Sequence, residues 1–595
     1  MNSNPTARSR GTKAEKAKNT KYTIKRLWDY LYYYKWLIIL ALVLTVCTNI
    51  LSLVGPMLSG YAIDAIEFGE GLVNFKNVYF YCLLMVIFYV SSSIISYVLS
   101  ILMMTISKKT VYKMRKDAFS KIQVMPVSFF DKNKTGDIIS KMSYDIDTVN
   151  TSLSSDLINI ITSVITVSVS LIMMIIISPI LVLVFVITIP ISLLFAKFMV
   201  KKSRPMFRMK TRKLGELSGF NEEMIASLKT IQAYGMEEEI IERFDIINED
   251  ATYNAYKAEY LGGITGPGVN FVNNLSFSLI CMFGGILSVI SDFTLGKIQS
   301  FILYSRKFSG PINEIANIFT ELQSALAAAE RVFTLIDGEE EKLDKETDIS
   351  LEEVVGNVEF QDVSFGYVPE KLVLKDVDFK AEKGKTIAIV GPTGSGKTTI
   401  VNLLMRFYDV TSGCIKLDEV NIDDIKRKDL RKSFAMVLQD TWLFEGSVYD
   451  NIVYGANNVT MEDVERVSKL SKIDTFVNRL ENGFDTILSD GGINISKGEK
   501  QLLTIARAML LDAKMLILDE ATSNVDTRTE VLIQEALKKL LENKTCFIIA
   551  HRLSTIQNAD LILVVKDGKI IQKGKHKELV NKEGFYKELY YSQFN

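Results

Sequence analysis

The stretch Gly391-Pro392-Thr393-Gly394-Ser395-Gly396-Lys397-Thr398 decides the fold of the second half of the chain. It has the spacing of a phosphate-binding P-loop, whose glycines let backbone N–H groups surround phosphate oxygens. The apolar run 386–390 (TIAIV) before it predicts a buried parallel strand, and the segment 399–408, which begins with Thr399, predicts a helix. The helix start adds its dipole to the phosphate site, and Lys397 supplies positive charge. Because a chance glycine-rich turn rarely has both flanking elements, we expect the chain to bind a nucleoside triphosphate.

A second apolar strand carries the acidic part of the expected site. The run 515–519 ends in Asp519, and Glu520 follows it. An acid at the carboxyl end of a strand beside a P-loop is placed to organise Mg²⁺ together with the Thr398 hydroxyl. Glu520 is then placed to act as general base on the attacking water, the alternative being a solvated strand end. These residues predict an α/β P-loop NTPase domain that uses ATP and Mg²⁺.

The composition divides the chain into two halves. The chain has 595 residues and a net charge of -1, and the part before about residue 333 is apolar and poor in acids. More than one domain is expected at this length, and the net charge gives no reason to expect a nucleic acid partner. Five scattered cysteines and two histidines argue against a disulfide framework and a histidine metal cluster. Residues 1–26 are expected to form a basic cytoplasmic arm without a signal peptide.

Apolar stretches in the first half are long enough to cross about 30 Å of hydrocarbon. Six are predicted, at 36–62, 78–106, 153–177, 180–200, 264–291 and 296–320. The sixth contains Arg306, Lys307 and Glu314, so a buried soluble helix is the alternative for it. Ionisable side chains inside a membrane usually face a cavity or a partner. We therefore expect these three residues to line a translocation path.

Lysine and arginine gather in the two long connections, 107–152 and 201–263. The positive-inside rule places these connections, and with them both chain termini, in the cytoplasm. Because the connections are rich in helix formers, we expect the spans to continue as helices with turns at 143–148 and 214–220. The acidic segment 334–355 is expected to link the membrane domain, 27–333, to an ATP-binding domain at 356–595.

The order of motifs in the second half resembles the nucleotide-binding domain of an ATP-binding cassette (ABC) transporter. Tyr367 precedes the P-loop, and Gln439, a helix start at Ser496, Asp526 and His551 lie beyond it. The apolar stretches with their long connections resemble the exporter type of membrane domain. The resemblance implies an α-helical six-span transmembrane domain fused to an α/β P-loop NTPase domain with a helical subdomain. It also implies a dimer, in which each ATP lies between one P-loop and the signature motif of the partner.

The resemblance implies a role for each matching residue. Tyr367 would stack on adenine, Gln439 would reach Mg²⁺ and sense the membrane domain, and Asp526 would lie at the dimer seam. Glu520 would be the general base, and His551 would contact the γ-phosphate. The alternatives are a surface tyrosine at 367 and a structural histidine at 551.

The signature motif departs from the family pattern. Where the family has L-S-G-G-Q, this chain has Ile495 followed by Ser496, Lys497, Gly498 and Glu499. Ser496 and Glu499 also form a capping-box pattern, which is a good helix start in itself. Glu499 would place negative charge beside the partner's ATP, and Lys497 would crowd the backbone approach. The departure predicts slow hydrolysis of the ATP that is bound against this signature. In this respect the chain resembles one subunit of the heterodimeric bacterial multidrug exporters.

The expected function is ATP-driven export of a hydrophobic or amphipathic substrate, multidrug or lipid-like, across the cytoplasmic membrane. The expected partner is a second ABC half-transporter in the same lipid bilayer. A homodimeric lipid flippase or peptide exporter is one alternative. A non-transporting ATP-gated channel or sensor is another.

Overall fold

The computed structural model describes residues 19–66, 73–291, 293–345, 354–368, 370–439, 441–489, 495–519, 526–549 and 556–594. The chain forms two compact units. The first comprises Met1–Met125 and Asn133–Glu340, and the second comprises Pro126–Lys132 and Glu341–Asn595. The short segment Pro126–Lys132 therefore belongs to the second unit although the first unit continues on both sides of it.

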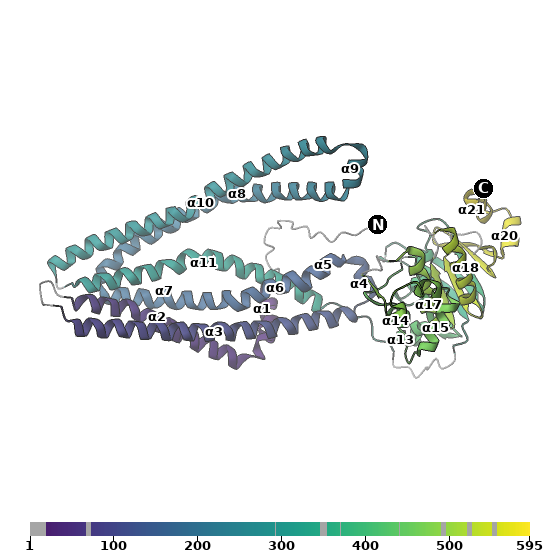
Figure 1. Ribbon diagram of the computed structural model, residues 1–595, viewed down its shortest axis with the longest axis horizontal. Coiled ribbons are helices and arrows are strands. Elements are labelled where there is room, and N and C mark those ends of the chain that lie inside the picture. The colour runs from purple at the N-terminus through teal and green to yellow at the C-terminus, as the bar shows by residue number, and fades with distance from the viewer. Residues whose placement is uncertain are drawn as a thin grey trace. The chain divides into compact units, whose positions relative to one another are not determined.

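The first unit is helical throughout its described part. Figure 1 shows α8 and α10 side by side, joined through the short α9. Two short π-helical segments, η1 and η2, interrupt the helical run that leads into α7. In chain order the elements are α1 (Thr20–Tyr32), α2 (Lys35–Asp64), α3 (Phe75–Gln123), α5 (Thr135–Ser140), η1 (Lys141–Asp145), α6 (Ile146–Thr151), η2 (Ser152–Asp156), α7 (Leu157–Ile177), α8 (Pro179–Ala226), α9 (Leu228–Tyr234), α10 (Glu237–Ile290) and α11 (Leu295–Ile336).

Five helical runs in the described chain are long and apolar enough to cross a membrane. They are Lys35–Asp64, Phe75–Gln123, Thr135–Ile177, Pro179–Ala226 and Glu237–Ile290. The first four contain the first four predicted spans, and the fifth contains all of the predicted span 264–291 except its last residue. Most of the runs extend well beyond the span, as the helix-rich connections predicted. The sixth predicted span lies in α11, which is a single helix of 42 residues but carries more charge. That α11 crosses the membrane stays a prediction.

The helices α2 and α11 pack closely at one end. A Cβ on Gly296 would lie 2.1 Å from the carbonyl oxygen of Gly60, so only glycine permits this approach of the two backbones. Asp64 fixes the register, since its carboxylate accepts hydrogen bonds from the Thr294 hydroxyl (2.8 Å) and from the Gly296 N–H (2.7 Å). Farther along, Tyr304 donates to the carbonyl oxygen of Leu53 at 2.7 Å. The first half of α11 is therefore held against α2.

The turn predicted at 143–148 is wrong. These residues lie inside the continuous helical run Thr135–Ile177, within η1 and α6. The chain turns earlier instead, on both sides of α4 (Val127–Lys132). Pro126 cannot continue the ladder of α3, whereas 143–148 holds neither proline nor glycine.

The turn predicted at 214–220 is also wrong, because these residues lie within α8. The chain reverses at α9, after Ala226. Gly235 caps α9 in the left-handed conformation, with φ +62°, and the next helix begins at Glu237. Gly215 and Gly219 are tolerated inside a long helix, so glycine by itself did not identify the turn.

The second unit contains two main sheets. The strand order is β12-β11-β3-β10-β9-β6 in the larger sheet, which is parallel except for β12, and β2-β1-β4-β5 in the smaller, antiparallel sheet. The strands are β1 (Val358–Phe365), β2 (Leu374–Ala381), β3 (Thr386–Val390), β4 (Ser412–Leu417), β5 (Val420–Asn421), β6 (Phe434–Val437), β9 (Met515–Asp519), β10 (Thr545–Ile549), β11 (Leu561–Lys566) and β12 (Lys569–Gly574). A small pair is formed by β7 (Gly446–Ser447) and β8 (Ile487–Leu488).

Helices surround these sheets. Besides α4, they are α12 (Lys397–Leu404), α13 (Arg427–Lys432), α14 (Val448–Val453), α15 (Met461–Leu470), α16 (Asp474–Val477), α17 (Lys497–Leu510), α18 (Thr527–Leu541), α20 (His576–Asn581) and α21 (Phe585–Phe594). The predicted strands 386–390 and 515–519 are confirmed as β3 and β9. The helix predicted at 399–408 instead covers Lys397–Leu404, so the P-loop lysine already belongs to its first turn.

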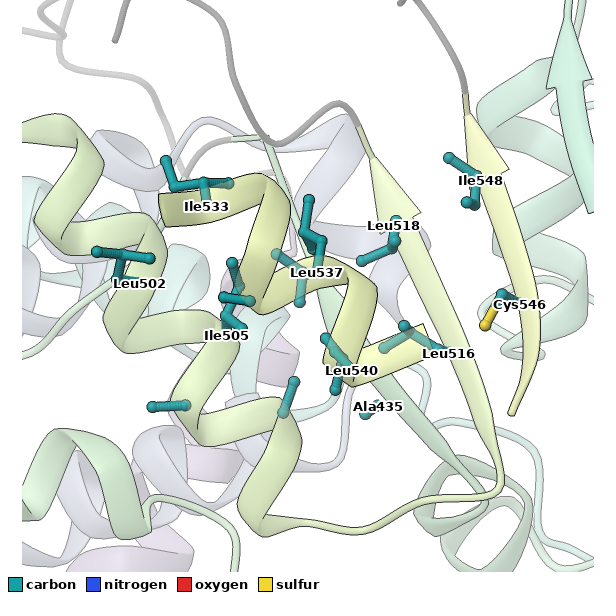
Figure 2. Close-up of a cluster of buried hydrophobic side chains, with 14 of the residues drawn as sticks. Ala435, Leu502, Ile505, Leu516, Leu518, Ile533, Leu537, Leu540, Cys546 and Ile548 are labelled. Carbon is teal, nitrogen blue, oxygen red and sulfur yellow. The ribbon is translucent and has the colours of Figure 1, made fainter. Parts of the chain in front are cut away.

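Two buried clusters hold the sheets together. Figure 2 shows one of them, which contains Leu502 of α17, Leu537 of α18, and Leu516 and Leu518 of β9. The other cluster joins the larger sheet to the antiparallel one, with Phe360 and Phe379 stacked at 4.5 Å between ring centroids. The parallel strands are thus buried on both faces, which is why β3 and β9 are apolar without alternation.

Candidate functional site

The P-loop connects β3 to α12 and keeps Lys397 folded onto the loop itself. The Lys397 side chain is 7% exposed, and Nζ donates hydrogen bonds to the carbonyl oxygens of Gly391 and Pro392, both at 2.9 Å. Burial lowers the pKa of this ammonium group, and the charge of Asp519 opposes that effect. The lysine is therefore a cation held in the loop by carbonyls that a phosphate could replace.

The loop begins at a position where only glycine fits beside β11. Gly391 has φ +154°, and a Cβ there would lie 2.1 Å from the carbonyl oxygen of Val565. Ser395 is buried, and its hydroxyl has no hydrogen-bond partner among the described residues. An unpaired buried hydroxyl is costly unless a ligand completes it. The unpaired hydroxyl of Ser395 therefore fits a bound phosphate chain.

The expected magnesium ligands lie at one edge of the larger sheet. Thr398 is in the first turn of α12 after β3, Asp519 is the last residue of β9, and Gln439 comes two residues after β6. These strands are parallel, so their carboxyl ends meet at the same edge. Thr398 and Gln439 are exposed, and hydroxyl, carboxylate and amide oxygens are the donors that Mg²⁺ prefers. The donor set fits Mg²⁺ next to the P-loop.

Tyr367 stands beside the P-loop helix. Its hydroxyl lies 3.3 Å from the Thr399 hydroxyl and accepts a hydrogen bond from the Asn402 amide at 3.3 Å. The ring packs edge-on against Tyr408, with 5.0 Å between centroids, and the side chain remains 40% exposed. A fixed aromatic ring with an open side is suited to stacking on a base.

The signature segment begins α17 with a complete capping box. The Ser496 hydroxyl accepts the Glu499 N–H at 3.3 Å, and the Glu499 carboxylate accepts both the Ser496 N–H (2.8 Å) and its hydroxyl (2.7 Å). Lys497 is exposed and Gly498 is buried in the first turn. The positive end of this helix is thus already occupied by a carboxylate of the chain itself.

Of the remaining predicted site residues, the structure describes Asp526 but not Glu520 or His551. Asp526 caps α18 by accepting the Thr529 N–H at 2.9 Å, and backbone hydrogen bonds lower the pKa of its carboxyl group. Its predicted place at a dimer seam stays a prediction. Glu520 and His551 lie outside the described residues.

The sequence did not predict the position of α4. Tyr408, which follows α12, donates a hydrogen bond from its hydroxyl to the Asp131 carboxylate of α4. Burial and this carboxylate raise the pKa of Tyr408. Tyr408 therefore contacts Tyr367 on one side and α4 on the other. Pro126 before α4 and the turn signals Asn133 and Gly136 after it could have marked the segment.

Part of the predicted acidic linker, the run 341–344, forms ion pairs and hydrogen bonds within the second unit. Arg427 is 7% exposed and pairs with Asp344 at 2.7 Å, and Arg431 pairs with Glu341 at 2.6 Å. Arg427 also donates to the carbonyl oxygen of Lys342 at 2.7 Å. The run 341–344 is therefore fixed to the second unit. The acidic residues of the linker and the basic residues of α13 could have predicted this contact from the sequence.

Two of the predicted path residues have described side chains. The Arg306 guanidinium lies 5.1 Å from the centre of the Phe277 ring, and Lys307 donates to the Ser52 hydroxyl at 2.9 Å. Glu314 belongs to the same helix, but its side chain is outside the described part. Arg306 is exposed and Lys307 is half-buried.

Two family models match the chain. One, described as the ABC transporter transmembrane region, matches residues 38–312, and the other, described as ABC transporter, matches residues 374–523. A fatty acid ABC transporter ATP-binding/permease protein of Mycobacterium tuberculosis is 40% identical over 482 residues, covering 81% of this chain and 76% of that protein. An ATP-dependent lipid A-core flippase of Vibrio vulnificus is 34% identical over 591 residues, covering 97% and 98%.

A solved structure has the same fold. It is a bacterial Atm1-family ABC exporter with ATP bound, which is 25% identical to this chain and superposes with a TM-score of 0.74. The match covers 94% of this chain and 98% of the other.

Proposed function

Because the chain belongs to the ABC transporter family, we propose that it exports an amphipathic, lipid-like substrate as one half of a heterodimer. It is an ATP-hydrolysing, multi-pass membrane transporter with the exporter fold. Transporters of this kind act as dimers in a lipid bilayer. We place it in the cytoplasmic membrane with both termini in the cytoplasm, on the distribution of lysine and arginine between its connections.

The nature of the substrate is supported by relatives and by the membrane unit. One relative is named for fatty acids and another for lipid A-core. In this chain, hydroxyl and amide side chains and the cation Arg306 accompany apolar helices. A substrate with one polar end and one apolar end matches such a surface. We therefore favour lipid-like amphiphiles over the wider class of multidrug substrates.

ATP would act through the described P-loop residues. Binding would draw Lys397 from the carbonyls of Gly391 and Pro392 to phosphate oxygens, and the Ser395 hydroxyl would gain a partner. Mg²⁺ held by Thr398, Asp519 and Gln439 would offset phosphate charge. Tyr367 would hold the adenine, and Glu520 and His551 would take the water and γ-phosphate roles that the resemblance implies.

The segment α4 offers a mechanical link. It packs within the second unit through Tyr408, and the chain continues from it directly into α3 and α5 of the first unit. A displacement of the ATP-binding unit would therefore pull on two long membrane helices. ATP binding and hydrolysis would select alternately between two arrangements of these helices.

The single observation that carries the heterodimer is the Glu499 carboxylate at the start of α17. A phosphate of the partner's ATP would meet a negative charge where the family has a neutral glutamine. We infer that this composite site holds ATP with little turnover, and that the site built on this chain's own P-loop hydrolyses it. A partner with an intact signature and without a general base would complete the pair.

The test is purification of the native complex through a tag on this chain. We expect a second, different half-transporter in the complex. Glu520→Gln should lower ATP hydrolysis by about 10²–10⁴, as expected for loss of a general base, while the equivalent change in the partner should have little effect. Full activity from this chain alone, or equal losses from the two changes, would contradict the asymmetry and favour a homodimer.

A further inference from the structure

Three lysines gather at the corner where α1 meets α2 and α3. Lys35 is the first residue of α2, and Lys109 and Lys113 lie one turn apart on the same face of α3. All three side chains are exposed, and none forms an ion pair with a described residue. We call Lys35, Lys109 and Lys113 the lysine corner. The ATP site makes no use of its positive charge.

The lysine corner lies at the level of the phospholipid head groups. Lys35 immediately precedes the predicted span 36–62, and Lys109 and Lys113 follow the predicted span 78–106. Because these spans are consecutive, the start of one and the end of the next lie on the same side of the bilayer. At 1.5 Å per residue, Lys109 and Lys113 are about 4 and 10 Å beyond the hydrocarbon. The head-group layer is about 5–8 Å thick on each side, and the long lysine side chains can extend into it.

Aromatic rings of α1 and its last turn hold Lys113 in place. The Lys113 Nζ lies 5.4 Å from the centre of the Tyr30 ring and 5.8 Å from that of Tyr33. Tyr30 is buried and donates a hydrogen bond at 2.7 Å to Asp117, the acid one turn beyond Lys113 on α3. Tyr33, in contrast, is 77% exposed. Lys113 is therefore a positioned cation with an open aromatic surface beside it.

Lys35 has similar surroundings. Its Nζ lies 4.8 Å from the centre of the Tyr32 ring and 6.0 Å from that of Trp36. Both rings are exposed, Trp36 to 75%. Exposed tyrosine and tryptophan rings beside lysine are typical of the bilayer interface, because their apolar bodies contact lipid while their polar tips stay hydrated. A soluble anion would use only the cations, so this combination fits a phospholipid better.

The lysine corner is also connected to the end of α11. The Tyr30 ring stacks on Phe333 of α11, with 5.8 Å between centroids. Arg26 of α1 pairs with Asp337, the residue that follows α11. A ligand that held Lys113 against α1 would therefore stabilise the packing of α1, α3 and the end of α11.

We propose that the lysine corner is a binding site for an anionic phospholipid of the surrounding bilayer. Phosphate oxygens would accept hydrogen bonds from the three ammonium groups, while the rings of Tyr33 and Trp36 would contact the glycerol and the upper acyl chains. A zwitterionic head group carries its own cation, which the lysines repel, so the site should prefer lipids of net negative charge. This lipid is a stabilising ligand of the membrane unit, distinct from the exported substrate.

The test compares phosphatidylglycerol with phosphatidylcholine of identical acyl chains. The native complex is purified in a neutral detergent, and native mass spectrometry measures the dissociation constant of the first lipid bound. Each lysine near an anionic head group contributes about fivefold, so phosphatidylglycerol should bind roughly tenfold tighter or more. Soluble glycerol 3-phosphate should not displace it, because it lacks the acyl chains. Displacement by glycerol 3-phosphate would indicate a site for free phosphates and overturn the proposal.

Variants locate the site. Lys109→Gln combined with Lys113→Gln should bring phosphatidylglycerol within about threefold of phosphatidylcholine, since two of the three cations are lost. The matched control is Lys201→Gln combined with Lys202→Gln. Lys201 and Lys202 are exposed, directly follow the predicted span 180–200 and have no ring contact among the described residues. The control should keep the full preference, and an equal loss in both double variants would show general surface attraction instead of a site.

A second variant keeps the proposal testable if the lysine variant does not fold. Tyr33→Ala leaves all three cations in place but removes a ring beside Lys113, and should weaken phosphatidylglycerol binding about two- to fivefold, the effect of one exposed cation–π contact. Phosphatidylglycerol should also raise the unfolding temperature of the parent complex more than phosphatidylcholine does, because it binds the folded state. Equal binding of the two lipids by the parent would overturn the proposal, as would an unchanged preference in both the lysine variant and Tyr33→Ala.

Discussion

Replacing Lys397 by alanine should weaken ATP binding by a predictable amount. In the structure, Nζ makes two hydrogen bonds to loop carbonyls at 2.9 Å, and these must be given up when it turns to phosphate. Two charge-assisted bonds to phosphate would contribute about 3–6 kcal/mol, and much of this is offset by the two bonds lost. The net effect is about 2 kcal/mol, or roughly a 30-fold weaker affinity.

The assay is titration of the purified complex with a fluorescent ATP analogue. Lys380→Ala is the matched control, because Lys380 is an exposed lysine on β2 of the same unit. It should leave the affinity unchanged. An unchanged dissociation constant for Lys397→Ala, with the protein folded, would refute the assignment of Lys397 to the phosphate site.

The same lysine gives the affinity a pH dependence of known sign. Burial lowers the pKa of Lys397 in the free protein, and phosphate binds the charged form. ATP binding therefore raises the pKa of Lys397 again, and at alkaline pH the lysine takes up a proton when ATP binds. The affinity for ATP should fall as the pH rises through the lowered pKa of the free protein. The Lys397→Ala variant should lose this part of the pH dependence. An equal alkaline decline in both proteins would contradict the explanation.

Further predictions concern the surroundings of the site. Arg427→Ala should destabilise the ATP-binding unit by about 2–4 kcal/mol in thermal unfolding, because it breaks a largely buried ion pair, whereas Arg466→Ala at an exposed pair should cost about 0–1 kcal/mol. Tyr408→Phe keeps the ring but loses the bond to Asp131, so ATP binding should persist while transport per ATP hydrolysed falls; an unchanged ratio would contradict the role of α4. Burial raises the pKa of Cys546 to about 12, so a maleimide at pH 8 should leave this thiol unlabelled until the protein unfolds, and rapid labelling of the native protein would contradict its burial.

Local patterns predicted the elements that carry the ATP site. The apolar runs 386–390 and 515–519 are short and have flanking residues that favour buried strands, and they form β3 and β9. The P-loop lies between β3 and α12 as expected. The capping box of Ser496 and Glu499 could likewise be predicted, since its hydrogen bonds join residues three positions apart. Such features depend on neighbours in the chain and are accessible from sequence.

Features that join distant residues could not be predicted in this way. The contact between Tyr408 and Asp131 connects positions 277 apart, and Arg306 meets the Phe277 ring only where α11 and α10 come together. The turns at the ends of α3 and α8 were misplaced because glycine or a polar run does not by itself end a helix. The sequence indicated that Arg306 is a cation in a predicted span, but the residues that surround it could be identified only from the structure.

The most direct test of the central claim is ATP-driven movement of an amphiphile across a membrane. The native complex, purified through a tag on this chain, is reconstituted in proteoliposomes with a fluorescent fatty acid or lipid analogue, and movement is followed by quenching from one side. The account predicts movement that requires hydrolysable ATP and disappears in Lys397→Ala. Steady ATP hydrolysis that moves no amphiphile, and that instead opens an ion conductance, would contradict it.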